Sequence, residues 1–259
     1  MRSIVALILV ALVATACGKK GPLVYPEMLV PSAPSNVAVQ QSGSSLKLSF
    51  VLPSKDRAGR NLSSLITGVT ILKRDIVADQ LPGCNACTDD FFVFRKLNLD
   101  VPSTGIQRNG SLIALLDGDV RTGRDYSYVV STVTREGAAG ASSAPITSAL
   151  VLPPLPPVLQ VISQPTVIDL EFIGQPSIEG SFAGFNVYRV MKGETFSYWP
   201  LNREPVTGNR YSDMGLERGV IYIYAVRTVT RLGSGAFVES GLSNEVEGKL
   251  KDDEYLLQF

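Results

Sequence analysis

The segment YIYAVRTVTRLG, residues 222–233, decides the fold of this chain, because it repeats an earlier segment. The earlier copy is YSYVVSTVTREG, residues 126–137, and eight of the twelve positions are identical. In an extended strand, Tyr222, Tyr224 and Val226 lie on one face, because successive side chains point to opposite sides. Each copy therefore predicts a strand whose tyrosines face the core.

Two further blocks repeat upstream in the same order. PSNVAVQQSGSSLKLSF, residues 34–50, aligns without gaps with PPVLQVISQPTVIDLEF, residues 156–172. ITGVTILKR, residues 66–74, parallels FAGFNVYRV, residues 182–190. Three blocks in one order indicate that a whole domain is duplicated.

The boundary between the copies is proline-rich. Residues 152–157 read LPPLPP, and four prolines in six residues favour a stiff polyproline II connector that limits the relative orientations of the domains. The predicted organisation is a signal peptide at 1–16, a lipidated cysteine and flexible tether at 17–33, a first domain at 34–152, a linker at 153–157, a second domain at 158–250 and a C-terminal tail at 251–259.

The pattern within each copy predicts an all-β fold. Leu46, Leu48 and Phe50 alternate with polar residues, which is typical of a strand with one face in the core and one in water. Neither copy contains a long amphipathic helix, and Gly, Pro, Asn and Ser separate short strands. We therefore predict two tandem antiparallel β-sandwiches.

These residues resemble the immunoglobulin-like fibronectin type III domains. The motif residues of the second copy are Pro156, Phe172, Gly184-Phe185-Asn186-Val187, and the run from Leu216 through Gly219, Tyr222 and Tyr224 to Val226. Those of the first copy are Pro34, Phe50, Gly68-Val69-Thr70-Ile71, Val120, Gly123, Tyr126 and Val130, and both copies have phenylalanine where the family often has tryptophan. The resemblance implies that Tyr126 and Tyr222 are structural tyrosine-corner residues, with buried rings and hydroxyls bonded to upstream backbone.

The N-terminus reads as an export signal. A cationic start is followed by the apolar run 4–13 and by small residues before Cys17. Residues 4–16 would span only about 20 Å as a helix, against about 30 Å of hydrocarbon. The segment resembles a bacterial lipobox, which implies that Cys17 becomes the acylated N-terminus; the alternative is an ordinary signal peptide with a chance cysteine.

Residues 17–23, CGKKGPL, resemble the start of LptM, a small outer-membrane lipoprotein associated with the lipopolysaccharide translocon. Gly18 also stands where an aspartate retains enteric lipoproteins at the inner membrane. The resemblance implies an outer-membrane lipoprotein of the bacterial cell envelope, facing the periplasm or the surface. A role as an accessory factor in outer-membrane or translocon assembly follows as an alternative function.

Cys84 and Cys87 lie in an insertion that makes the first copy twenty residues longer between its second and third blocks. For an exported chain we expect a local disulfide. Thiol redox chemistry, a metal site completed by Asp89 or Asp90, and two free thiols remain open. The Phe91-Phe92-Val93-Phe94 cluster that follows is expected to cover a sandwich edge rather than to form an exposed binding ridge.

The composition excludes several functions. The 259 residues carry 24 basic and 24 acidic side chains, so no basic face for a nucleic acid is expected. With no histidine, the chain lacks Ser-His-Asp and Cys-His nucleophile systems. We expect no catalytic residue, no metal site and no cofactor besides the lipid. The expected function is non-catalytic: two β modules, anchored to a membrane, contact an envelope protein or a glycan, with strand addition as one mode.

The anchor can be tested at one residue. In the native host, Cys17→Ala should abolish incorporation of labelled palmitate and release the chain from the membrane fraction, because the thioether has no sulfur to form on. Metabolic labelling and fractionation measure both, with Cys84→Ala as the matched control. Labelling of the Cys17→Ala variant would contradict the assignment.

Overall fold

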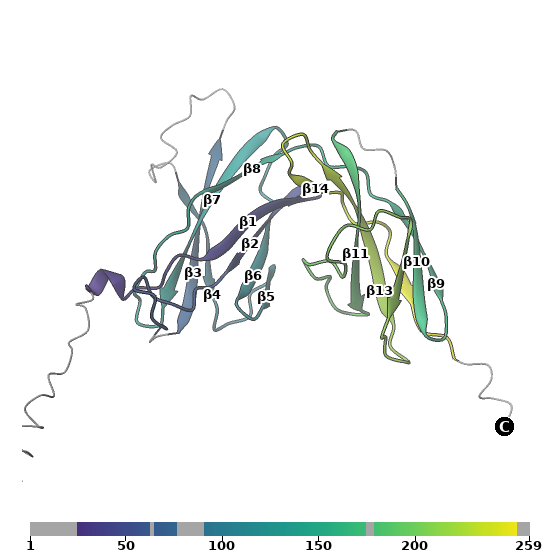
Figure 1. Cartoon of the computed structure of the whole chain (residues 1–259), viewed down its shortest axis with the longest axis horizontal. Coiled ribbons are helices and arrows are strands. Elements are labelled where there is room, and N and C mark those ends of the chain that lie inside the picture. Colours follow the sequence, from purple (N-terminus) through teal and green to yellow (C-terminus); the bar gives the residue numbers. More distant parts are fainter. Residues whose placement is uncertain (1–24, 63–64, 77–90, 175–178, 253–259) are drawn as a thin grey trace, which may run out of the picture.

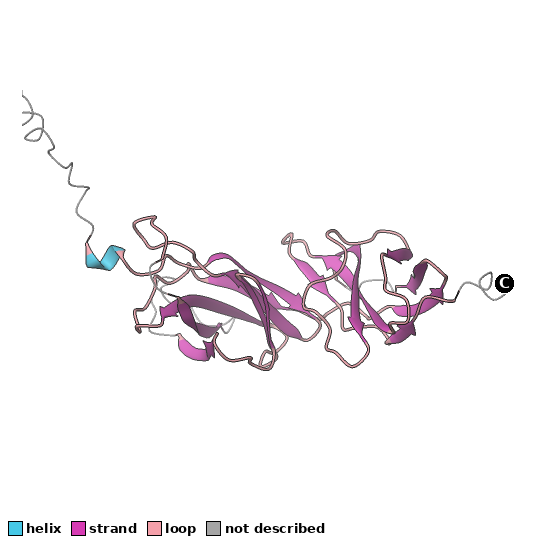
Figure 2. Ribbon diagram, turned by 90° about the horizontal axis from the view of Figure 1, so that it is seen from below, coloured by secondary structure: helices cyan, strands magenta, loops and turns pink. Residues whose placement is uncertain are grey.

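A computed structural model describes residues 25–62, 65–76, 91–174 and 179–252 (Figure 1). Apart from the three-residue 3₁₀ helix η1 (Pro26–Met28), the regular structure of these residues is β-strand (Figure 2). The strands form several sheets in which nearly all neighbours are antiparallel. The all-β class predicted from the alternating segments is confirmed.

The described part of the N-terminal half forms a first β unit. Its strands are β1 (Ser35–Ser42), β2 (Ser45–Val51), β3 (Ile66–Ile76), β4 (Phe92–Asn98), β5 (Ile106–Asn109), β6 (Leu112–Asp117), β7 (Arg124–Thr134) and β8 (Ile146–Leu150). One sheet has the order β4-β3-β7-β8, and the other contains β1-β2-β6-β5. Between them lies a hydrophobic core to which β2, β3, β6 and β7 all contribute.

The C-terminal half forms a second β unit with its own core. Its strands are β9 (Val158–Ser163), β10 (Val167–Ile173), β11 (Ser181–Met191), β12 (Arg210–Met214), β13 (Tyr222–Arg231), β14 (Phe237–Glu239) and β15 (Val246–Gly248). One sheet has the order β12-β10-β9, and β13 of the other pairs with β11, β14 and β15. This core is built mainly from β10, β11 and β13.

The alternating residues of β2 and β10 face these cores, as predicted. Leu46, Leu48 and Phe50 are almost completely buried. The three aligned residues of β10 are equally buried: Ile168, Leu170 and Phe172. Each such side chain stabilises the fold by about 1.5–3 kcal/mol relative to exposure, so the two strands are principal contributors to their cores.

Two of the four polar residues between them are buried, so the prediction of one wet face is wrong at Lys47 and Asp169, whereas Ser49 and Glu171 are partly exposed. Lys47 is covered by a loop of the second β unit. Asp169 is buried beside Ser212 Oγ at 2.5 Å and Arg210 Nη2 at 2.7 Å. Both side chains are buried by partners that are distant in sequence, which a local alternation cannot indicate.

The two units share one sheet. Its order is β11-β13-β14-β1-β2-β6-β5, so it crosses the boundary at β14 and β1. These two strands pair in parallel, with Gln41 opposite Val238 and Ser42 opposite Glu239. The Gly43 N–H also donates to the Glu239 carbonyl at 2.9 Å. Figure 1 shows this joint at the top of an arch formed by the two units.

The chain is held in place two residues before the segment predicted as a linker. Residues 153–157 have no helix or strand. Just before them, the amide of the buried Gln41 side chain donates to the Val151 carbonyl at 2.8 Å and accepts from the Val151 N–H at 3.0 Å. Gln41 thus pairs with the chain as a neighbouring strand would, and it holds the start of the connector against β1.

A buried ion pair stands beside the first core. Lys73 Nζ lies 2.6 Å from Asp117 Oδ2, and the Tyr128 hydroxyl donates to the same oxygen at 2.6 Å. Lys73 is only 3% exposed, and its ammonium also donates to the Asp119 carbonyl at 2.5 Å. Burial, followed by the bond to Asp117, raises the pKa of Tyr128, so its hydroxyl stays protonated as a donor.

The second unit repeats this triad at the aligned positions. Arg189 Nη1 lies 3.0 and 2.8 Å from the two Asp213 oxygens, and the Tyr224 hydroxyl donates to Asp213 at 2.8 Å. The Arg189 side chain is 29% exposed, so this cation reaches water whereas Lys73 does not. The duplicated architecture therefore has one dry copy and one open copy of the same interaction.

Neutralising the aspartate should cost more stability in the first triad, whose cation is buried, than in the second. Asp117→Asn leaves the Lys73 ammonium buried without its counter-charge and is expected to lower the free energy of unfolding by about 3–5 kcal/mol. Urea unfolding followed by circular dichroism measures this loss.

Asp213→Asn is the matched control. It removes the same carboxylate in the second unit, but the freed Arg189 can be solvated, so the loss should be clearly smaller. Equal losses in the two variants would show that exposure of the cation does not control the cost.

Candidate functional site

The two predicted tyrosine-corner residues occupy equivalent positions. Tyr126 and Tyr222 are buried, and their hydroxyls accept from the N–H groups of Arg121 at 2.8 Å and Glu217 at 3.1 Å. In both cases the donor lies five residues upstream. The cation of each triad also lies over the tyrosine ring, at 4.6 Å from its centroid in the first unit and 5.1 Å in the second. Both tyrosines are therefore structural, and Tyr222 in addition lines the smaller of the two clefts described below.

The three cysteines lie outside the described residues. The lipidation predicted at Cys17 and the disulfide predicted between Cys84 and Cys87 therefore remain predictions. Within the described ranges, no helix is long and apolar enough to cross a membrane. The same ranges contain no cluster of three or more metal-ligating side chains.

The aromatic cluster at 91–94 is divided between core and solvent. Phe94 packs against the first core, and its ring stands edge-on to Tyr128 at 6.3 Å. Phe92 and Val93 are each just over half exposed on the edge strand β4. The cluster contributes one ring to the core and presents two apolar side chains at the edge.

The loop between β11 and β12, residues 192–209, connects the second unit to the first. Lys47 Nζ donates to the Tyr198 carbonyl at 3.1 Å. The Gln107 amide donates to the Phe196 carbonyl at 2.7 Å and accepts from the Tyr198 N–H at 2.6 Å. The loop is therefore fixed to β2 and β5 on the concave side of the arch (Figure 1).

A glycine allows this loop to return along β11. At Gly184 the strand register shifts and φ is +139°, a conformation that side chains rarely adopt. A Cβ there would stand 2.7 Å from the Val206 carbonyl oxygen. Immediately afterwards, Phe185 and Val206 exchange two backbone hydrogen bonds of 2.9 Å. The end of the loop thereby covers the outer edge of β11.

The joint contains a buried carboxylate. Glu239 is completely buried and accepts hydrogen bonds from Ser42 Oγ at 2.9 Å, Asn186 Nδ2 at 2.5 Å and the Tyr188 hydroxyl at 2.6 Å. Lys47 Nζ lies 4.0 Å from Glu239 Oε2, the oxygen that also accepts from Ser42. Ser42 and Lys47 belong to the first unit, so this carboxylate bonds both units together.

The environment keeps Glu239 ionised. Burial alone would raise its pKa, but the Lys47 charge and the three hydrogen bonds outweigh this effect and hold the pKa below its ordinary value. The pKa values of two partners of Glu239, Lys47 and Tyr188, are shifted in opposite directions. Burial lowers the pKa of Lys47, which is close to Arg227 as well as Glu239, and burial beside Glu239 raises the pKa of Tyr188.

A cleft of about 860 Å³ opens next to this joint and is the main candidate site. We call it the Trp199 cleft, and the residues that define it are Lys47, Phe182, Trp199, Arg203, Arg231 and Phe237. Its floor is the shared sheet and its wall is the loop 192–209. Its volume is in the range of small-molecule and oligomer sites, and both units line it.

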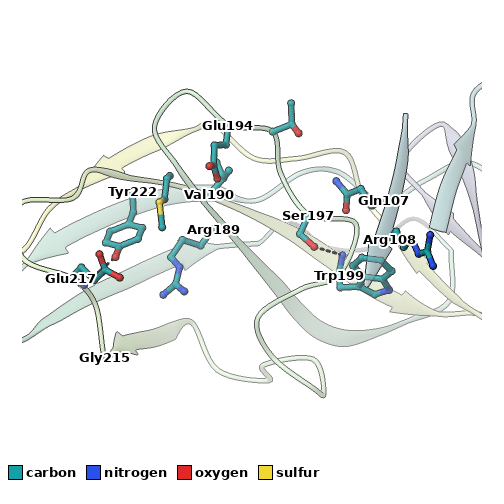
Figure 3. Close-up of a pocket in the computed structure, with 12 residues that line it drawn as sticks. Gln107, Arg108, Arg189, Val190, Glu194, Ser197, Trp199, Gly215, Glu217 and Tyr222 are labelled. Atoms are coloured by element: carbon teal, nitrogen blue, oxygen red, sulfur yellow. Dashed lines mark hydrogen bonds between the residues drawn. The ribbon is translucent and has the colours of Figure 1, made fainter. Parts of the chain in front are cut away.

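A second cleft of about 520 Å³ lies on the other side of Trp199. Figure 3 shows Tyr222 and Glu217 toward one end and Gln107 and Trp199 toward the other. The Trp199 N–H donates to Ser197 Oγ at 3.0 Å, which shapes the loop between the two clefts. Two arginines line this cleft: Arg189 is paired with Asp213, and Arg108 donates to the Gly110 carbonyl at 2.9 Å. The Trp199 cleft is the larger of the two and has three aromatic rings in its lining, so we take it as the main candidate.

Comparison with known proteins does not assign this chain to a family. No known family model matches the chain, and no curated protein sequence matches it. A solved structure titled "Myokine structure" is similar to 38% of this chain over 99% of its own, at 18% identity and a TM-score of 0.31. So distant a likeness indicates nothing about function.

Sequence reasoning identified the repeats and missed the cleft. One signal was available: Trp199 is the only tryptophan of the chain, and it lies in the aromatic and proline-containing stretch FSYWP of the second copy. Nothing local could have indicated Glu239, because its partners lie 51 to 197 positions away in the chain.

The joint should weaken in acid. Because the folded pKa of Glu239 is lowered, its stabilising contribution is complete above the unfolded pKa, near 4.5, and is lost as pH falls through the lower folded pKa. Glu239→Gln should therefore cost about 3 kcal/mol of unfolding free energy at neutral pH and should flatten the decline of stability as the pH falls below about 4.5. Urea unfolding at several pH values measures both.

Glu247→Gln is the control for this experiment. Glu247 pairs with Lys192 on the surface, where both side chains are more than half exposed. Its neutralisation should cost less than about 1 kcal/mol. A Glu239→Gln variant with the pH profile of the wild type would refute the assigned role of the carboxylate.

Proposed function

We propose that this protein is a lipid-anchored, non-catalytic binding protein of the bacterial cell envelope that holds an envelope ligand in the Trp199 cleft. The observation that supports this most directly is the rigid joint. The shared sheet, the buried Glu239 and the pairing of Gln107 with the loop fix both walls of the cleft before any ligand arrives. A preformed site avoids the cost of ordering its walls on binding.

The proposal includes an assignment of the two β units to a particular kind of β-sandwich. Each unit has a buried tyrosine whose hydroxyl bonds to backbone five residues upstream, and each has the Gly-containing strand of the resemblance, with Gly68 in β3 and Gly184 in β11. We therefore assign both units to the fibronectin type III-like sandwiches. Domains of this kind commonly present binding surfaces on cell-surface proteins.

The start of the described chain and the cleft lie at opposite ends of the first unit. The described chain begins at the η1 end, and β1 runs from there to the joint (Figure 1). Eight strand residues span about 27 Å. If Cys17 is acylated, the anchor joins the chain at the η1 end of the first unit, and the cleft lies at the far end of β1, where a periplasmic or extracellular partner can reach it.

A photocrosslinker at Phe182 tests this function. A photoreactive phenylalanine analogue at this cleft position should capture an envelope component in intact cells, whereas the same analogue at Ile173 should not. Ile173 is 70% exposed and does not line the cleft. The captured material is identified by mass spectrometry. Equal capture at both positions, or none at Phe182, would overturn the proposal.

A further inference from the structure

The Trp199 cleft presents aromatic rings that the fold does not need to bury. Phe182 and Phe237 are 47% and 43% exposed, and Trp199 is half-buried between the two clefts. Phe182 is supported from one side by the edge of Phe185, with ring centroids 5.1 Å apart. An open ring face carries partial negative charge and attracts C–H groups of a ligand.

Basic side chains outnumber acidic ones in the cleft: Lys47, Arg203 and Arg231 line it together with Glu204. Arg203 and Arg231 are exposed and line it, and neither has a carboxylate within 4.0 Å among the described residues. The Arg231 guanidinium lies 5.9 Å from the centre of the Phe237 ring. Stacking of this kind orients the fork of donors and leaves its edge free for a carboxylate.

The floor and the loop wall offer further polar groups without partners. Within the described part of the chain, the side chains of Gln40, Ser49 and Thr207 line the cleft and make no hydrogen bond. An amide and two hydroxyls can both donate and accept. These groups suit a ligand that is rich in hydroxyls.

The strand edges at the joint and along the middle of β11 are closed to an extended peptide. β14 is paired on one side with β13 and on the other with β1, and β1 is paired in turn with β2. The outer edge of β11 is covered where Phe185 pairs with Val206 and where Leu201 N–H donates to the Val187 carbonyl at 2.8 Å. Strand addition is therefore blocked along these parts of the cleft, and a ligand there must be recognised mainly by side chains.

We propose that the Trp199 cleft binds an acidic oligosaccharide. Its carboxylates pair with Arg203 and Arg231, its sugar faces pack on the rings of Phe182 and Trp199, and its hydroxyls bond to the polar floor. This inference rests on the proposed binding function and specifies the class of ligand.

The probe is tetragalacturonic acid, and its fully methyl-esterified form is the matched neutral ligand. Each is titrated into the full mature chain in detergent, with Trp199 fluorescence and calorimetry as readouts. Because Trp199 is the only tryptophan, a fluorescence change reports on the two clefts that it lines, and the variants described next assign the binding to one of them. We expect saturable binding of the acid that weakens with salt, and at least tenfold weaker binding of the ester.

Charge and ring variants locate the site. Arg203→Gln should weaken binding of the acid about 10- to 100-fold and leave folding unchanged, since this exposed side chain has no partner among the described residues. Phe182→Ala should weaken it about 2- to 10-fold. Arg57→Gln, an exposed arginine of the first unit away from the cleft, should leave the affinity unchanged.

The outcomes separate this inference from the proposed function. If hexaglutamate binds more tightly than tetragalacturonic acid, or if the acid and the ester bind equally, the acidic oligosaccharide is the wrong class. In that case capture by the Phe182 crosslinker would still support a binding cleft. Binding that survives Arg203→Gln undiminished would also overturn the inference, because the carboxylate contact would lie elsewhere.

Discussion

The arrangement of the two β units depends on the ionised carboxylate of Glu239. A buried charge costs several kcal/mol unless it is fully compensated, and here Ser42, Asn186, Tyr188 and Lys47 supply that compensation. Because donors come from both units, separating the units would leave the carboxylate without part of its partners. The parallel pairing of β1 and β14 is short, and this cluster makes its register specific.

The joint also explains where a binding site can form. Lys47 and Gln107 of the first unit hold the loop 192–209 over the shared sheet, and the loop in turn places Trp199 between two clefts. A flexible pair of domains would lose such a surface with every change in angle. In this protein the joint between the two units has two consequences. It buries Glu239, which makes the pair of units rigid, and it forms the cleft beside it.

The duplication shows how two copies of one design diverge. Both units keep the tyrosine that bonds upstream backbone and the Tyr-Asp-cation triad. In the first unit the cation of the triad, Lys73, is buried. In the second unit the cation is Arg189, which is partly exposed to water at a cleft. The stabilising residues were retained, and the exposed features of the second copy, namely the aromatic loop and its arginines, are where binding groups gather.

The sequence by itself determined the all-β class, the duplicated pattern and the core faces of β2 and β10, because strand alternation and repeated motifs are local properties. It also pointed to the two buried tyrosines. Only the tertiary structure decided that Lys47 is buried, that Glu239 bonds two units and that Trp199 separates two clefts. The physical reason is that a polar side chain's environment is set by residues far away in the chain, whose approach depends on the whole fold and leaves no periodic trace around the residue itself.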